Sequence, residues 1–421
     1  MDTVTHGIVG ALIGKALFAE DPSQIAPTWL ERPRTAGRVA IISATLGAIF
    51  PDIDVFAGPL AHNALAMITW HRGITHSLVM LPLWAILLAA ITYWLVKLID
   101  WPSPAFGTLI AIYAAGIASH IFLDLITSFG TMIWSPLDYS RPAWDWVFII
   151  DLTLTSLALM PQLAAWAFQR PKRVLRRALP LWGICAAAVF ALVPIARNYD
   201  VPFDNGTALG ASLFFGGFFL LPLRHGTGNR VGRSKWCRIG MAMCFLYLSS
   251  AAAIHHSALQ QMTQFSDEAR LNVQSIGALP LPPSIARWAG LVSTSEGVYR
   301  LQFDEFSGDP VRIRFFRNAS DNSYVAAARN LPDVQRFLWF ARFPLVQYFE
   351  RGDQRVVRIT ALNRLSIVCT ISSALKALWA KSRSHVRTSA HQISAGSSID
   401  SQCCVVLCFK CCTRIDLISS R

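Results

Sequence analysis

Charged residues are scarce in this sequence. Of its 421 residues 15% are Asp, Glu, Lys or Arg, whereas an ordinary soluble domain carries roughly 25%. Hydrophobic residues make up 53%, and they gather in runs long enough for helices that cross a bilayer, which takes about 20 residues per helix. The composition therefore excludes an ordinary soluble globular protein and predicts an all-α polytopic membrane helix bundle.

Acidic residues are the scarcer charged class, since 25 Asp and Glu stand against 38 Lys and Arg, a net charge of +13. Much of the basic excess lies in short loops such as 172–177, where basic residues are typical of the cytoplasmic side of a membrane protein. We interpret the charge as a topology signal and expect no nucleic-acid partner. Residues 1–18 also lack the basic start of a cleavable signal peptide, so none is expected.

Eight apolar segments occupy the first 259 residues. Two of them, 4–19 and 39–50, are shorter than a standard span. They could be short helices within the bundle or re-entrant pieces, which must be buried against protein. The other six segments are 78–96, 106–126, 147–168, 179–196, 209–223 and 239–259. Together the eight predict a transmembrane domain that covers residues 1–259.

The basic loops orient this domain. Loops 170–177 and 224–238 should face the cytoplasm, and counting the spans backwards puts loop 20–38, with its three arginines, on the same side. Loops 55–76 and 127–146 then lie outside. The orientation uses Lys and Arg alone, yet it brings the candidate site residues described next to the outer end of the bundle.

Residues with metal-ligand side chains recur at that outer end. His120 and Asp124 are four residues apart in an apolar run, so on a helix they share one face and suit one cation or two neighbouring cations. An Asp within a bilayer is costly unless it is paired, metal-bound or in contact with water. A satisfied structural pair is the alternative interpretation, and the further candidate ligands weigh against it.

Three further pieces of sequence add ligands at the same end. His71 and His76 have a spacing that is poor for one helical face, so we place them on a loop and the following helix start. Asp52 and Asp54 offer two carboxylates on an extended segment, with solvated acids at a helix stop as the alternative. The predicted metal ligands are His6, Asp52, Asp54, His71, His76, His120 and Asp124.

Imidazole and carboxylate ligands without thiolate favour zinc, with manganese and iron as alternatives, and this many candidates would suffice for one or two ions. Zinc lowers the pKa of a bound water to ~7 and polarises a scissile group. Asp54 or Asp151 could take the proton from that water. The planar guanidinium of Arg72 fits a phosphate or carboxylate of a substrate, and an anchor in the lipid headgroups is its equal alternative.

The pattern changes after residue 259. Residues 260–363 contain no spanning run, and segments 298–303, 311–316 and 356–360 alternate apolar and polar residues as half-buried strands do. They predict a small α+β domain outside the membrane. Residues 364–421 are Ser-rich, and we interpret them as a disordered or aberrant tail. Its clustered cysteines resemble half of a zinc site without a second half: Cys403, Cys404, Cys408, Cys411 and Cys412.

At the His and Asp motifs the sequence resembles the bacterial inner-membrane metal-dependent hydrolases of the LexA-regulated YdjM type. The matching pieces are residues 1–7, 50–54, 71–77 and 119–124, continued by 127–131. The resemblance covers roughly residues 1–200 and leaves the rest of the chain aside. It implies a multi-spanning membrane protein assigned as a hydrolase, distantly similar to zinc-dependent phospholipase C-like enzymes, and it implies no particular substrate.

We therefore expect an integral membrane metal-dependent hydrolase in the bacterial inner membrane. Its site and its C-terminal domain should lie on the periplasmic side, and its substrate should be a phosphoester or another small or lipid-like molecule. One alternative is a non-catalytic membrane protein with a structural metal site and an outer binding domain. A transporter is another, but it should carry ionisable residues at mid-depth and on both sides, whereas here they crowd one end.

Overall fold

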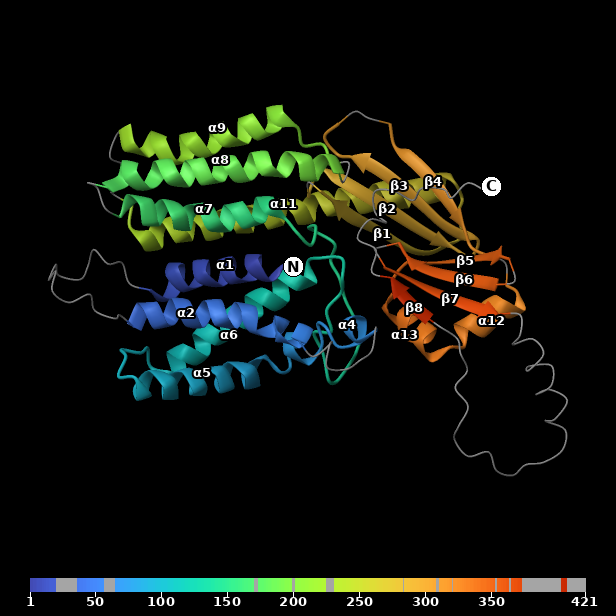
Figure 1. Ribbon diagram of the computed structural model, residues 1–421, viewed down its shortest axis with the longest axis horizontal. Coiled ribbons are helices and arrows are strands. Elements are labelled where there is room, and N and C mark those ends of the chain that lie inside the picture. Colours follow the sequence, from blue (N-terminus) through green and yellow to red (C-terminus); the bar gives the residue numbers. More distant parts are fainter. Residues whose placement is uncertain are drawn as a thin grey trace, which may run out of the picture.

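The structure is a computed structural model in which a helix bundle is joined by one long helix to a region of two β-sheets (Figure 1). It describes residues 1–19, 36–56, 65–169, 173–198, 201–224, 231–282, 284–307, 310–319, 321–352, 354–362, 365–372 and 403–406.

Each of the eight predicted apolar segments is helical. The helices are α1 (Thr3–Ile13, continued by a π-helical turn, Gly14–Phe18), α2 (Ala36–Ile49, continued by a 3₁₀ turn, Phe50–Phe56), α5 (Leu81–Leu98), α6 (Phe106–Leu125), α7 (Leu152–Phe168), α8 (Val174–Asn198), α9 (Asn205–Arg224) and α11 (Arg233–Glu268). Within the described residues five of these segments are long and apolar enough to cross a membrane, and three are shorter apolar helices.

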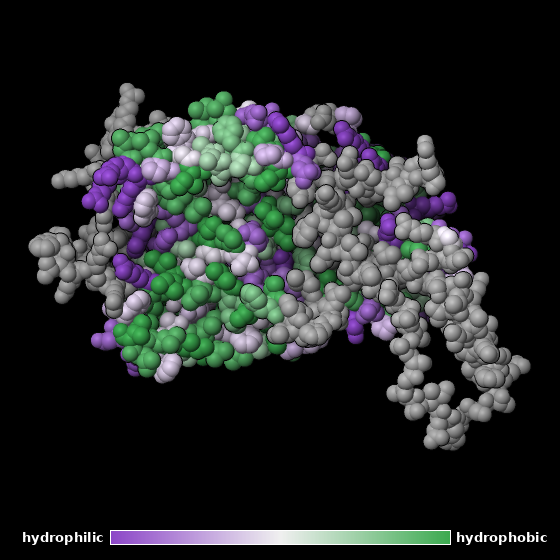
Figure 2. Space-filling model, viewed as in Figure 1, coloured by the Kyte–Doolittle hydropathy of each residue, from purple (hydrophilic) through white to green (hydrophobic). Residues whose placement is uncertain are grey.

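The outward faces of the bundle are apolar, as a lipid-facing surface requires. Leu83 and Trp94 of α5, Phe214 of α9 and Phe245 of α11 are all exposed. Figure 2 shows hydrophobic residues over much of the bundle on the side in view. This exposure of large apolar side chains on several helices confirms the predicted membrane helix bundle.

Small residues let α1, α2 and α6 approach closely. A Cβ atom added to Gly10 of α1 would lie 2.5 Å from the Cβ atom of Ala48. One added to Gly116 of α6 would lie 2.7 Å from the carbonyl oxygen of Ala44. Backbones this close are typical of membrane helices that pack through small residues. The packing brings the site-bearing ends of the three helices together.

Several helix ends differ from the prediction by a few residues, and two of these differences have a clear local cause. Helix α7 begins at Leu152 rather than at 147, because Asp151 caps its first turn by accepting a hydrogen bond from the backbone N–H of Leu154 at 2.9 Å. Helix α11 continues to Glu268 instead of ending at 259. Its last turns are polar on one side only, and on the other side Met262 packs against Trp288 in a buried cluster.

The region after α11 contains two four-stranded antiparallel sheets and two short helices. Sheet A consists of β1 (Val273–Leu281), β2 (Arg287–Thr294), β3 (Gly297–Asp304) and β4 (Arg312–Arg317), and sheet B of β5 (Pro344–Arg351), β6 (Gln354–Ala361), β7 (Leu365–Ser372) and β8 (Cys403–Val406). Helices α12 (Ser323–Arg329) and α13 (Pro332–Phe340) lie between the sheets in sequence. This confirms the predicted α+β region, and the three predicted strands correspond to β3, β4 and β6.

The predicted tail boundary at residue 364 passes through sheet B. Strand β7 pairs along its whole length with β6, and β8 pairs with β7. Residues 365–372 and 403–406 therefore differ from the expected disordered tail. The prediction missed these strands because a strand here depends on partners distant in sequence, which weak local periodicity does not reveal. Cys408, Cys411 and Cys412 lie outside the described residues.

Candidate metal centre

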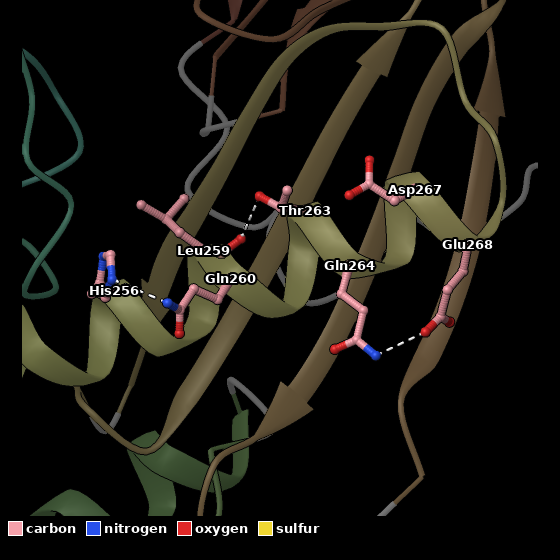
Figure 3. Close-up of a pocket in the computed structure, with 7 residues that line it drawn as sticks. All are labelled: His256, Leu259, Gln260, Thr263, Gln264, Asp267 and Glu268. Atoms are coloured by element: carbon pink, nitrogen blue, oxygen red, sulfur yellow. Dashed lines mark hydrogen bonds between the residues drawn. The ribbon is translucent and has the colours of Figure 1, made fainter.

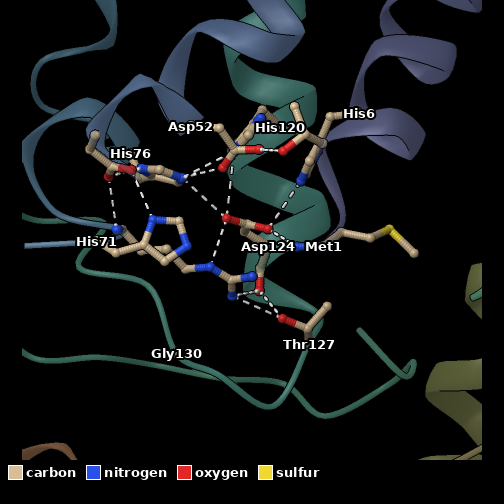
Figure 4. A network of polar contacts seen from close by, with 12 residues as sticks. Met1, His6, Asp52, His71, His76, His120, Asp124, Thr127 and Gly130 are labelled. Atoms are coloured by element: carbon tan, nitrogen blue, oxygen red, sulfur yellow. Dashed lines mark hydrogen bonds and ion pairs between the residues drawn. The ribbon is translucent and has the colours of Figure 1, made fainter. Parts of the chain in front are cut away.

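The site residues come from four separate elements at the end of the bundle that faces the sheets (Figure 1). His6 lies in the second turn of α1, and Asp52 in the 3₁₀ turn after α2. His76 ends a short 3₁₀ turn, Ile74–His76, and His120 with Asp124 lies near the end of α6. Figure 4 shows these side chains turned towards one another. The predicted convergence of distant residues is thus present in the fold.

Four of these side chains form one compact group: Asp52, His76, His120 and Asp124. The Nε2 atoms of His76 and His120 lie 3.0 Å apart. Oδ1 of Asp52 lies 3.6 Å from the first and 3.4 Å from the second, and Oδ2 of Asp124 lies 3.2 Å and 3.5 Å from them. In a tetrahedral site with metal–ligand bonds of about 2.0–2.1 Å, ligand atoms are about 3.3–3.4 Å apart. The group therefore has the dimensions of a four-coordinate metal site.

The second nitrogen of each histidine is already engaged, which fixes the orientation of both rings. Nδ1 of His120 lies 2.6 Å from the carbonyl oxygen of Ala48, to which it can only donate. Nδ1 of His76 lies 3.3 Å from Oδ2 of Asp54. A histidine that donates through one nitrogen presents the lone pair of the other, as metal-binding histidines do. Both Nε2 atoms therefore suit a cation.

Asp124 is buried, and its two oxygens have different surroundings. Oδ1 contacts the amino group of Met1 and lies 3.1 Å from Nε2 of His6. Oδ2 lies 2.9 Å from Nε of Arg72 without hydrogen-bond geometry, and it has no hydrogen-bond partner among the described residues. A buried carboxylate oxygen that faces two imidazoles and lacks a hydrogen bond fits a metal ligand.

His6 supports this group from one side. Its ring stacks on that of His120, with the centroids 3.6 Å apart, while its Nε2 atom is directed to Asp124. His6 was predicted as a ligand, and the structure places it in contact with two members of the four-residue group rather than within that group.

Asp54 and His71 form a second group with His76. Asp54 accepts hydrogen bonds from Nδ1 of His71 at 2.8 Å, from the backbone N–H of Arg72 at 3.0 Å and from the Thr75 hydroxyl at 3.0 Å. These contacts hold the loop that carries both histidines.

Burial and charge act in opposite directions on the two loop histidines. Burial lowers the pKa of His71, although Asp54 opposes that change. Burial also disfavours the charged form of His76, but its close contacts with the carboxylates of Asp124, Asp52 and Asp54 outweigh burial and raise its pKa to about 10. The carboxylates around His76 thus attract positive charge strongly enough to overcome burial.

Arg72 is buried, so the alternative of an anchor in the lipid headgroups is wrong. Besides its ion pair with Asp124, Nη1 donates to the Asp124 carbonyl at 3.2 Å and to the Thr127 hydroxyl at 3.0 Å. Its backbone has a φ of 61°, in the left-handed region that few non-glycine residues adopt. Such local strain is kept where surrounding contacts fix it, here those that place the guanidinium beside the metal group.

Asp151 is not brought to this site by any contact among the described residues. Besides capping α7, it accepts a hydrogen bond from the Tyr247 hydroxyl at 2.7 Å, which ties α7 to α11. An Asp at the start of α7 has a local explanation, because Asp is among the residues that best cap the first turn of a helix. Asp151 is therefore not assigned to the metal site.

Several site contacts were not predicted from the sequence. Thr3 donates a hydrogen bond to Oδ2 of Asp52 at 2.5 Å, and Thr75 donates one to Asp54. The Thr127 hydroxyl accepts one from Arg72. Each threonine lies within one of the His and Asp motifs or shortly after one, and this closeness in sequence could have indicated a role beside the ligands. The Ala48 carbonyl gave none, because a backbone atom has no sequence signature.

A surface hollow of about 570 Å³ lies elsewhere, along the C-terminal turns of α11 (Figure 3). It is lined by His256, Leu259, Gln260, Thr263, Gln264, Asp267 and Glu268. It shares no residue with the metal group. Its polar side chains bond along the helix, as Gln264 does to Glu268 at 2.8 Å, and a solvated helix face accounts for them.

Comparison with known proteins agrees with the resemblance seen in the motifs. Residues 1–199 match the model of the YdjM inner membrane protein family. The uncharacterized protein YfhP of Bacillus subtilis (strain 168) is 30% identical over 136 residues, which cover 32% of this chain and 37% of YfhP. The aligned part is thus well under two thirds of the relative's length. No solved structure matches this chain.

Proposed function

From the match of residues 1–199 to the YdjM inner membrane protein family, and from the metal group that they enclose, we propose that this multi-pass membrane protein is a metal-dependent hydrolase. The observation that carries the proposal is the spacing of the four ligand atoms: the two Nε2 atoms lie 3.0 Å apart, and each lies 3.2–3.6 Å from the two carboxylate oxygens. Coupled with two imidazoles held in the ligand orientation, it supports a site built for a cation rather than a chance cluster of polar groups.

The proposed ion is one zinc ion, held by Asp52, His76, His120 and Asp124. Two nitrogen and two oxygen ligands at these separations suit zinc, with manganese or iron as alternatives. When bound, a zinc ion supplies a nucleophilic water at neutral pH and polarises the scissile bond. Proton transfer and the binding of the substrate are assigned to side chains of the protein.

His71 is the proposed proton acceptor, with Asp54 as its orienting partner. Asp54 receives Nδ1–H of His71, so Nε2 is left with the lone pair that can accept a proton. This assignment refines the sequence-based choice of Asp54 as the base, because Asp54 already accepts three hydrogen bonds. Arg72 is proposed to place positive charge beside an anionic group of the substrate while it holds Asp124.

A phosphoester with an apolar portion is the proposed substrate class. The most exposed side chain of the site is His71, at 16%, followed by Asp54 and Asp52 at 10% each, so the edge at His71 is the proposed entrance. Around it Ile53, Trp70 and Ile74 are exposed although they are apolar. Such residues beside a polar site at the end of membrane helices suit a lipid-like molecule, whose headgroup and chains lie at the same boundary. The outer face of the membrane is the proposed location.

A structural metal site is the second candidate. It is favoured by one observation, namely that His76, His120 and Asp124 are fully buried. Closed sites in which the protein supplies all four ligands are typical of structural zinc.

Metal analysis of the detergent-purified protein tests the metal site first. We expect about one zinc per chain in the wild type, loss in His120→Ala, and retention in His71→Ala, with His256→Ala as the control for loss of an unrelated histidine. Loss in His71→Ala as well would point to a second ion held by Asp54, His71 and His76. Absence of metal from the wild type under zinc-replete conditions would overturn the proposal.

Turnover then separates the enzyme from the structural alternative. Phospholipids and a soluble phosphodiester should be offered to the same samples. We expect hydrolysis by the wild type, loss in His120→Ala, and loss in His71→Ala despite its retained metal. A protein that holds zinc but hydrolyses neither class of ester would instead support the structural site.

A further inference from the structure

Arg141, in the loop between α6 and α7, connects the metal site to the C-terminal region. Its guanidinium donates to three backbone carbonyls: Nη1 to Ile68 at 3.1 Å, Nη2 to Gly130 at 3.1 Å, and both to His71 at 3.4 Å. The side chain therefore crosslinks the segment that carries the site histidines to the segment that follows α6. Burial lowers its pKa to about 9, which leaves the guanidinium charged at neutral pH.

Aromatic rings of two regions surround the same guanidinium. Its Cζ atom lies 5.3 Å from the ring centre of Phe129, next to the site, and 5.3 Å and 5.6 Å from those of Phe340 and Trp339. The last two belong to the end of α13. Cation–π contacts of this kind gain strength where the cation is removed from water.

The ring of Phe129 lies between α13 and Arg72. Its ring centroid lies 5.1 Å from that of Phe340 on one side, and on the other it lies 4.8 Å from Cζ of Arg72. It also lies 5.7 Å from the ring of His71. Ile68, in the short helix α4 (Ala66–Thr69), is buried in one cluster with Phe337 of α13. The C-terminal region thus packs directly on the site loop.

A half-buried ion pair makes a second connection. Arg342, just after α13, donates through Nη1 and Nη2 to the two oxygens of Asp145 at 2.7 Å and 2.8 Å. On either side of Asp145, the backbone N–H of Trp144 donates to the Leu125 carbonyl and that of Trp146 to the Ile126 carbonyl, each at 2.8 Å. These carbonyls come directly after Asp124 in the chain. A bidentate pair of this geometry is among the stronger charged contacts.

We propose that the C-terminal region is a positioning module for the metal site. The positioning residues are Arg342 of that region and Arg141 of the α6–α7 loop, on which the end of α13 packs. Through Arg141 it holds the His71–Arg72 segment, and through Arg342 it holds the end of α6 that carries Asp124. The effect on the metal rests on the function proposed above, whereas the restraint on the two segments does not. Both arginines act through backbone atoms and other side chains, so neither is assigned to the chemistry.

Hydrogen exchange of the full-length protein in detergent tests the restraint without reference to metal. We expect Arg141→Lys to raise amide exchange of residues 68–76, and Arg342→Ala to raise that of residues 121–127 at the end of α6, each at least about tenfold, because local opening becomes easier when these contacts are lost. Arg336→Ala is the matched control: Arg336 lies on α13 itself, and its ion pair with Asp333 is exposed. Unchanged exchange in both test variants would overturn the proposal.

Rescue and a spectroscopic readout separate positioning from general stability. Arg342→Asp combined with Asp145→Arg restores the opposite charges. The double change should return amide exchange at the end of α6 to within about threefold of the wild type, whereas each single change should not. Cobalt added to metal-free protein reports ligand geometry through its visible absorption. We expect a weakened or shifted spectrum in Arg141→Lys and Arg342→Ala. The spectrum of Arg336→Ala should match that of the wild type.

The two readouts have distinct meanings. Faster exchange with an unchanged cobalt spectrum would show that the contacts are merely structural, which overturns the positioning role. If the wild type binds neither cobalt nor zinc, the proposed function fails, and the exchange result still decides whether the C-terminal region restrains the two segments.

Discussion

Nδ1 of His120 lies 2.6 Å from the carbonyl oxygen of Ala48, seventy-two positions earlier in the chain. This contact joins α6 to α2 and settles which nitrogen of His120 faces the other ligands. It exists because Gly116, one turn before His120, lets the two backbones meet. The closeness of two helices, and not only the identity of the ligands, therefore sets the geometry of the metal group.

Gly116→Val should disrupt the site from a distance. A Cβ atom there would lie 2.7 Å from the Ala44 carbonyl oxygen and 3.0 Å from the Ala48 backbone nitrogen, so α2 and α6 must separate. We expect a loss of about 1–3 kcal/mol in stability, the usual cost of overpacking, and weaker metal binding. Thermal unfolding in detergent and metal analysis are the measurements.

The matched control is Gly107→Val, in the same helix, where an added Cβ meets no atom within 4 Å. It should leave both the unfolding temperature and the metal content near those of the wild type. Equal behaviour of the two variants would mean that the close approach of α2 and α6 does not govern the site.

Asp54→Asn should weaken metal binding without abolishing it. In the structure Asp54 faces Nδ1 of His76, at 3.3 Å, and not the group of ligand atoms. Loss of such an orienting carboxylate typically costs 10–100-fold in affinity. Asp52→Asn removes an oxygen from the four-residue group itself and should cost more. Competition with a zinc chelator measures both, and an inverted order would exchange the roles of the two carboxylates.

Much of this arrangement could be predicted from the sequence, because its causes are local or follow from charge. The four-residue spacing of His120 and Asp124 places both on one helix face, and the structure has them in one group. Long apolar runs predicted each helix of the bundle. Alternation in 298–303 and 356–360 predicted two strands that the structure confirms as parts of β3 and β6.

The rest depends on atoms rather than on residue types. Spacing could not distinguish Asp52, whose oxygen joins the ligand group, from Asp54, which orients a histidine. Nor could it reveal that Asp151 caps a helix and binds Tyr247. The restraints from Arg141 and Arg342 were also beyond prediction, because they join segments far apart in sequence through contacts that only the folded chain brings about.

His71→Gln should separate catalysis from metal binding. His71 lies outside the four-residue group and is oriented by Asp54 through Nδ1. If it accepts the proton, its loss should lower turnover by about 10²–10⁴-fold, the usual contribution of general base catalysis, while the metal content stays at the wild-type value. Parallel metal analysis and phosphoester turnover check this.

The matched control for that variant is His256→Gln, on α11 and outside the metal group. It should change neither quantity. Full turnover in His71→Gln would remove His71 from the mechanism, and loss of metal from it would return His71 to the ligands.

Reporter fusions after Ser140 and after Leu175 should place these positions on opposite sides of the membrane. Between them runs α7, and beyond it lie Arg173, Arg176 and Arg177, whose charge favours the cytoplasm. A reporter active only outside the cytoplasm should therefore work after Ser140 and fail after Leu175. Because Arg141 directly follows the first fusion point and contacts the carbonyl of His71, that outcome would also assign the site to the outer face. If both fusions report the same side, α7 does not cross the bilayer, and a site that opens at the outer headgroups loses its basis.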